Sequence, residues 1–159
     1  MSRKLKIILA ISVAVNIILF IILTLEYNKK HTVTEKIFLN LVRHELLLLN
    51  ENLDAQKNNG WTEPVIVQIQ LIDVLDAIYL AVSTGIELNA LSKKEIENYN
   101  EFWRIIRNSI PSHEFTETDK VNLEQLQKQL DDVGIINGTN TETYNSFRTK
   151  IELLVDKVN

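Results

Sequence analysis

Two carboxylates, Asp73 and Asp76, come closer to a chemical site than any other residues of this sequence. They stand three positions apart within the apolar stretch 63–84, so a helix would place them one turn apart on one face. If buried, such a pair could bind a cation or a basic ligand, or act as general acid and general base. Trp103 could line the same cleft. Asp73, Asp76 and Trp103 are therefore the candidate interaction or ligand site.

The two acids also have a simpler interpretation, which we favour. Asp73 would share a solvent edge with Gln70 and Ala77, and Asp76 would form an ion pair with an arginine. The arginines considered are Arg43, Arg107 and Arg148. In that case both carboxylates have a structural role only.

No other pattern indicates catalysis, a metal site or a cofactor. The absence of Cys excludes a thiolate zinc site, a cysteine nucleophile and a disulfide framework. His31, His44 and His113 stand in none of the spacings found in zinc proteases or in ferritin-like proteins. The four glycines are isolated, so no phosphate-binding loop is expected. We therefore expect a protein that is not an enzyme and that holds no cofactor.

The beginning of the chain predicts a membrane anchor. Residues 1–6 form a basic tail, and residues 7–25 form an apolar run of nineteen residues (25 − 7 + 1). As a helix this run would span about 28 Å, close to the thickness of a hydrocarbon core. No small-residue cleavage pattern follows, which favours retention of the anchor over its removal as a signal peptide. We predict that the tail lies inside and that residues 26–159 form an extracytoplasmic domain.

The apolar run contains three residues that could join two anchors. Ala10 and Ala14 have small-xxx-small spacing, and Asn16 is a polar residue near mid-membrane. Small side chains let two helices approach closely, and an amide can form a hydrogen bond to a partner helix. These residues are candidates for anchor oligomerisation. The alternative is that a single Asn is tolerated and the alanines have no partner.

The pattern of apolar residues in 26–159 predicts an all-α bundle of about five helices. Apolar residues recur at spacings of three and four, and the whole chain has only four Gly and two Pro. Because no Gly or Pro precedes Gly60, the anchor and the first bundle helix can form one rod from Lys4 to Asn58. A kink in the polar interval 28–34 would contradict this continuity.

The next two helices have clear local signals. Residues 63–84 are apolar nearly all round, so we expect a central helix that ends at Gly85. Ser92 and Glu95 form a capping box, which predicts the start of the following helix. No second apolar run suited to a membrane span is expected after the anchor.

Charge and architecture lead to a functional hypothesis. Residues 26–159 carry 14 basic residues (17 − 3) and 21 acidic residues, a net charge of −7, which disfavours nucleic acid as a partner. We predict a single-pass membrane protein, with its helical bundle in a bacterial envelope, that binds another envelope protein as an accessory or regulatory subunit. The alternative is a signal-input domain that binds a small ligand between helices and couples it to a membrane partner. A homo-oligomer is also compatible with the sequence.

Overall fold

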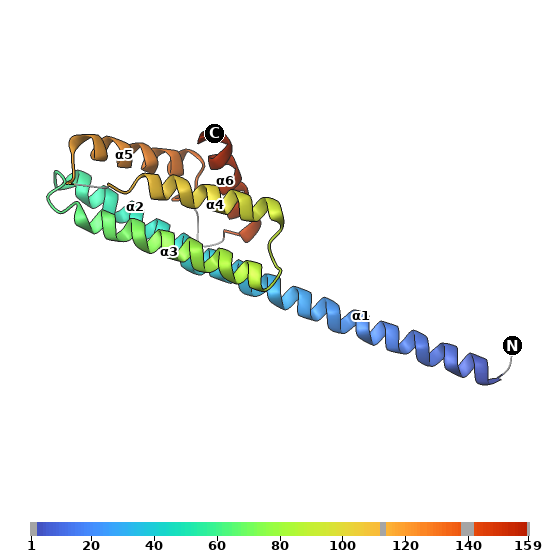
Figure 1. Cartoon of the computed structure of the whole chain (residues 1–159). Helices are drawn as coiled ribbons and strands as arrows, with labels where there is room; N and C mark the ends of the chain where they lie inside the picture. The colour runs from blue at the N-terminus through green and yellow to red at the C-terminus, as the bar shows by residue number, and fades with distance from the viewer. Residues whose placement is uncertain (1–2, 112–113, 138–141, 159) are drawn as a thin grey trace.

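In the described part of the chain, all regular secondary structure is helical. The computed structural model describes residues 3–111, 114–137 and 142–158, with side chains from residue 12 onward. This confirms the predicted all-α class. The elements are α1 (Arg3–Ile37), η1 (Phe38–Val42, a π-helical turn), α2 (Arg43–Asn58), α3 (Val65–Glu87), α4 (Lys93–Asn108), α5 (Glu117–Asp132) and α6 (Tyr144–Val158). Helices α2 to α6 form the bundle, and most of α1 projects from it (Figure 1).

The first three elements form one continuous helix, which we call the rod (Figure 1). The predicted continuity from Lys4 to Asn58 is confirmed, and the polar interval 28–34 is regular α-helix inside α1. Within that interval the hydroxyl of Thr34 donates a hydrogen bond to the carbonyl of Lys30 at 3.2 Å, so this buried polar group is satisfied by the helix itself. The irregular turn of the rod lies further on, at η1.

The π-helical turn keeps one side of the rod against the bundle. Buried residues of the rod follow one another four positions apart: Thr34, Phe38, Val42 and Leu46. In an α-helix each step of four residues advances about 400°, so three steps would rotate the buried side by about 120°. The wider π turn removes part of this drift. Helix α2 then continues the buried side with Leu49 and Leu53.

Helix α3 packs alongside the rod and also contacts α4 (Figure 1). Its inner side is buried at Val67, Leu71, Val74, Ile78 and Ala81. These side chains form the middle of the hydrophobic core together with the buried side of the rod.

Gly85 does not end α3, so that prediction is wrong. The helix continues to Glu87, and Asn89 adopts the left-handed conformation after it, with φ of 52°. Gly85 is buried, and a Cβ atom there would lie 2.5 Å from the side chain of Leu91 and 3.2 Å from that of Thr34. The missing side chain therefore allows α3 to approach the rod closely. The predicted capping box of Ser92 and Glu95 does start α4.

Replacement of Phe38 tests the packing between the rod and the bundle. Its ring is fully buried and stacks on that of Tyr99 on α4, with centroids 4.2 Å apart. Phe38→Ala is expected to lower the free energy of unfolding by about 3–5 kcal/mol, because a buried ring is replaced by a cavity. Urea unfolding of the full chain in mild detergent measures this. Phe20→Ala is the matched control, since Phe20 lies on the same rod but is exposed; equal unfolding midpoints for the two variants would contradict the assignment of Phe38 to the core.

Candidate interaction surface

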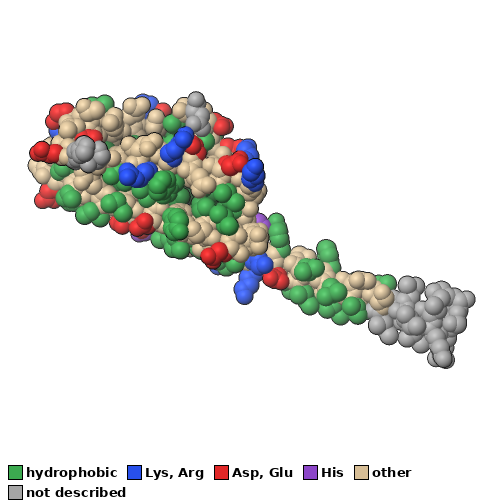
Figure 2. Space-filling view, viewed as in Figure 1, with side chains coloured by type: hydrophobic (Ala, Val, Ile, Leu, Met, Phe, Trp, Pro, Cys, Tyr) green, Lys and Arg blue, Asp and Glu red, His purple; other side chains and the backbone are tan. Residues whose placement is uncertain are grey.

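One side of α3 is apolar and uncovered, although the helix is central in the bundle. The predicted central position of α3 therefore applies to its inner side only. Seven large apolar side chains on this helix are between 38% and 70% exposed. We call the exposed side chains of α3 the outer face; they are Val65, Ile66, Ile69, Ile72, Asp73, Asp76, Tyr79, Leu80, Ile86 and Glu87. Figure 2 shows hydrophobic side chains gathered along the part of the bundle where Figure 1 places α3.

A regular stripe of side chains runs along the whole helix, and all its members except Ser83 belong to the outer face. Steps of four and three residues alternate through Val65, Ile69, Ile72, Asp76, Tyr79, Ser83 and Ile86. An average step of 3.5 residues keeps side chains in line when a second helix lies alongside. Five of the seven positions carry large exposed apolar side chains, and Asp76 is the single charged position. The spacing thus fits the docking of another helix.

The predicted acid pair lies on this face. Asp73 and Asp76 are both exposed, near the middle of α3. Gln70 and Ala77, which were expected to share a solvent edge with Asp73, are buried instead, because they face the rod side of α3. That part of the structural interpretation is wrong.

Asp76 does not form the expected ion pair. Arg43 Nε lies 3.0 Å from a carboxylate oxygen of Glu142, and Arg148 Nη1 lies 3.0 Å from one of Glu95. Within the ranges that the structure describes, no ion pair involves Asp76 or Asp73. Both carboxylates are therefore left to solvent.

A shallow hollow of about 260 Å³ opens between the outer face and the rod. Its lining residues are Leu41, Glu45, Asp73, Asp76, Ala77 and Leu80. Gln70 Nε2 donates to Glu45 Oε2 at 2.8 Å and so orients the third carboxylate. Trp103 does not line this hollow; it packs against the core from α4. The structure brings Asp73 and Asp76 to one place but does not bring Trp103 to them.

The anchor residues are only partly described. Ala14 and Asn16 are exposed on α1, whereas the side chain of Ala10 lies outside the described part of the chain. Two helices are long and apolar enough to cross a membrane, the rod from Ser12 onward and α3. The second contradicts the expectation that no further apolar run follows the anchor, although half of its most apolar window is buried in the bundle.

The His, Asp and Glu side chains of the described residues form no candidate metal site. Over residues 3–111, 114–137 and 142–158, no three side chains of His, Asp or Glu are arranged to hold a metal ion. His44 is exposed on α2, and His113 lies outside the described residues.

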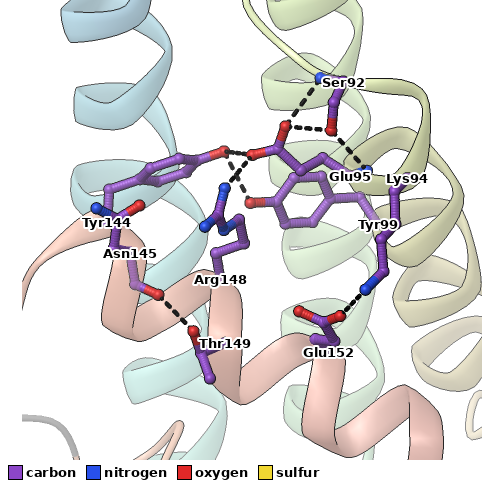
Figure 3. Close-up of polar contacts among 9 residues, drawn as sticks. All are labelled: Ser92, Lys94, Glu95, Tyr99, Tyr144, Asn145, Arg148, Thr149 and Glu152. Atoms are coloured by element: carbon purple, nitrogen blue, oxygen red, sulfur yellow. Dashed lines mark hydrogen bonds and ion pairs between the residues drawn. The ribbon is translucent and has the colours of Figure 1, made fainter.

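A polar cluster between α4 and α6 is the second site that we considered (Figure 3). Tyr99 donates its hydroxyl hydrogen to the Tyr144 hydroxyl at 2.9 Å, and Tyr144 donates to Glu95 Oε1 at 3.4 Å. Arg148 Nη1 donates to the same Glu95 oxygen at 3.0 Å. The other Glu95 oxygen accepts from the backbone N–H and the hydroxyl of Ser92, at 2.8 and 2.6 Å. One carboxylate therefore joins the start of α4 to α6.

The protonation states of this cluster favour a structural role. Burial raises the pKa of Tyr144 to about 12 and also raises the pKa of Tyr99, so both phenols are neutral near pH 7. Burial acts to raise the pKa of Glu95, but hydrogen bonds from Ser92 and Arg148 outweigh it and hold that pKa below its ordinary value. A neutral phenol pair next to a carboxylate paired with arginine does not supply a general base near neutral pH.

The sequence located only two members of this cluster together, Ser92 and Glu95. The capping box identified Glu95, but Tyr144 and Arg148 reach it from a helix about fifty residues later, and no local pattern connects them.

Replacement of Glu95 tests the charge of this cluster. Glu95→Gln retains a capping side chain and removes the charge opposite Arg148, so we expect a loss of about 1–2 kcal/mol in the free energy of unfolding at pH 7. Because the pKa of Glu95 is lower in the folded than in the unfolded chain, its stabilising effect is complete above about pH 4.5 and disappears as the pH falls through the folded value. The difference between wild type and variant should therefore shrink as the pH falls below about 4.5.

Urea unfolding at several pH values measures this difference. Glu97→Gln is the matched control, because the Lys93–Glu97 pair on the same helix is exposed and contributes little. A difference between wild type and Glu95→Gln that is independent of pH would show that packing, and not charge, is responsible.

Comparisons with known proteins add no relative to this description. No family model, no curated protein and no solved structure matches the chain.

Proposed function

We propose that this protein is a membrane-anchored interaction module whose outer face binds a helix of another envelope protein, for which it acts as an accessory or regulatory subunit. The observation that carries the proposal is the exposed apolar side of α3. Large contiguous apolar patches on a protein surface typically mark interaction sites.

The bundle itself does not need these side chains for its core. The inner side of α3 already packs against the rod and α4, whereas the apolar residues of the outer face stay between 38% and 70% exposed. Full burial of one Ile, Leu or Val side chain contributes about 1.5–3 kcal/mol. Covering the exposed halves of six aliphatic side chains and one tyrosine would therefore drive the docking of a partner.

The anchor in this proposal is the apolar run of α1. Its side chains from Val13 to Leu25 are mostly exposed, and α1 projects from the bundle as a single helix (Figures 1 and 2). Such a helix requires an apolar surrounding. We do not assign α3 to the membrane, because half of its apolar window is buried and two carboxylates lie at its middle. The bundle would stand outside the cytoplasm, with a single membrane span.

A pair of reporters tests this topology. Alkaline phosphatase fused at the C-terminus should be active, and green fluorescent protein fused there should be dark after Sec-dependent export, because each reporter works on only one side of the membrane. N-terminal fusions serve as the opposite control. Fluorescence of the C-terminal fusion would place the bundle in the cytoplasm and contradict the proposed topology.

Photocrosslinking tests the outer face in cells. A benzophenone amino acid in place of Tyr79, which is 70% exposed, should give a discrete crosslinked band with another protein. Ile69→Glu in the same chain should reduce that band at least about tenfold, because a carboxylate would become buried in the interface. The unfolding midpoint should not change, since Ile69 is exposed.

Val121 provides the matched control for both steps. It is an exposed apolar residue on α5, away from the outer face. The probe at this position should not give the band, and Val121→Glu should leave the band from position 79 intact. Bands of equal strength from positions 79 and 121, or a band from position 79 that Ile69→Glu leaves unchanged, would contradict the proposal.

The second candidate, a signal-input domain, is favoured by a hollow at the base of the bundle. This hollow of about 420 Å³ is lined by Tyr27, His31 and Glu35 of α1 and by residues of α4 and α6, Arg148 among them. A small ligand there would touch the anchor helix and the bundle at once, and the continuous rod would connect it to the membrane. No enzymatic activity is proposed.

A further inference from the structure

From the outer face and the hollow beside it we infer the chemistry of the partner: an apolar helix of a different protein that lies along α3 and inserts a lysine or arginine between Asp73 and Asp76. This inference rests on the proposed function and adds the identity of the contact.

The shape of the outer face indicates that the bound partner is a helix. The stripe from Val65 to Ile86 covers 22 residues (86 − 65 + 1) in steps of four and three, which corresponds to about 32 Å of helix. A partner helix that crosses α3 at a shallow angle can contact the stripe over its full length. Tyr79, the most exposed side chain of the stripe, supplies the large aromatic contact that is common in the centre of interfaces.

The negative charge of the outer face indicates that the partner helix carries a basic side chain. Helix α3 contains no Lys or Arg, and its charged residues are Asp73, Asp76 and Glu87. A helix docked on the stripe would remove Asp76 from water. A carboxylate that is buried without a partner of opposite charge is strongly destabilising, so the partner has to supply one.

The hollow fits the side chain that would carry this cation. Leu41, Ala77 and Leu80 give it apolar walls, while Asp73, Asp76 and Glu45 place three carboxylates around it. Lysine and arginine have an aliphatic stem that packs on apolar surface and a charged end that seeks carboxylates. The apolar walls and the acids of this one hollow match the two parts of such a side chain.

Two other occupants fit the face less well. Copies of this chain anchored in one membrane would stand in the same direction, so a two-fold pair of α3 helices would be parallel and would set Asp76 against Asp76 of the second copy. Like charges in contact at an interface oppose such pairing. Lipid hydrocarbon is disfavoured because Asp73 and Asp76 lie midway along the apolar stripe.

The experiment uses designed peptides as stand-ins for the partner. Three fluorescent amphipathic helices of four heptads carry Leu and Ile at the seam positions and differ only at one central seam position, which is Lys, norleucine or Glu. Their binding to the full chain in phosphatidylcholine nanodiscs is measured by fluorescence anisotropy, with empty nanodiscs as the blank. We expect the Lys peptide to bind at least about tenfold more tightly than the Glu peptide and more tightly than the norleucine peptide.

The inference requires that Asp73 and Asp76 cause the tighter binding of the Lys peptide. The double variant Asp73→Asn, Asp76→Asn should bring the Lys and Glu peptides to within about twofold of each other. Adding Asp76→Lys to Asp73→Asn should reverse the order in favour of the Glu peptide. Glu87→Gln is the matched control, because Glu87 lies on the outer face but not in the hollow, and it should leave the preference unchanged. All three positions are exposed, and unchanged thermal unfolding would confirm that the variants fold.

The inference is overturned if the norleucine peptide binds as tightly as the Lys peptide, if the Asn double variant keeps the Lys preference, or if no peptide binds above the blank. It is also overturned if the crosslinked partner at position 79 is a second copy of this chain. The proposed function fails separately, when position 79 gives no band that depends on Ile69, whatever the peptides do.

Discussion

The packing of α3 along the rod is the interaction on which the rest of this structure depends. Phe38, Val42 and Leu46 form one buried side of the rod, and the inner side of α3 covers it. The π-helical turn keeps the rod in phase with α3, and Gly85 allows the two helices to approach near the base of the bundle. Without this contact the rod would be an isolated helix, which has little stability of its own in water.

The remaining helices complete the core on the side away from the outer face. Helix α5 packs on α2, and α6 packs on α4 and η1. The carboxylate of Glu95 and the ion pair of Arg43 with Glu142 tie α6 to this side. Helix α3 is therefore covered on one side only, and the apolar side chains of its outer face remain exposed. This arrangement makes the helix structural on one side and available for binding on the other.

Two carboxylates on an apolar outer face have a physical consequence for binding. An entirely apolar stripe would attract many helices, detergents and lipids with little discrimination. A charged residue at one position lowers the affinity for most of these and favours partners that supply the opposite charge. In this interpretation Asp73 and Asp76 give selectivity to a surface whose affinity comes from isoleucine, leucine and tyrosine.

The sequence by itself determined the features that depend on neighbouring residues. Spacings of three and four predicted the helices, the long run without Gly or Pro predicted the rod, and Ser92 with Glu95 predicted the start of α4. All these signals arise within one or two helical turns, where the chain interacts with itself. The uncovered side of α3 could not be predicted in this way, because an apolar residue carries the same local signal whether another helix covers it or not.

Tertiary structure decided the features that depend on distant parts of the chain. It placed Gly85 inside α3, since only the nearby Thr34 and Leu91 make its missing side chain necessary. It also paired Arg148 with Glu95 and Arg43 with Glu142, and it left Asp76 exposed. The hollow at Asp73 and Asp76 exists only because η1 and α2 lie beside α3. The direction that each helix face takes is set by the packing of the other helices, and no local spacing encodes it.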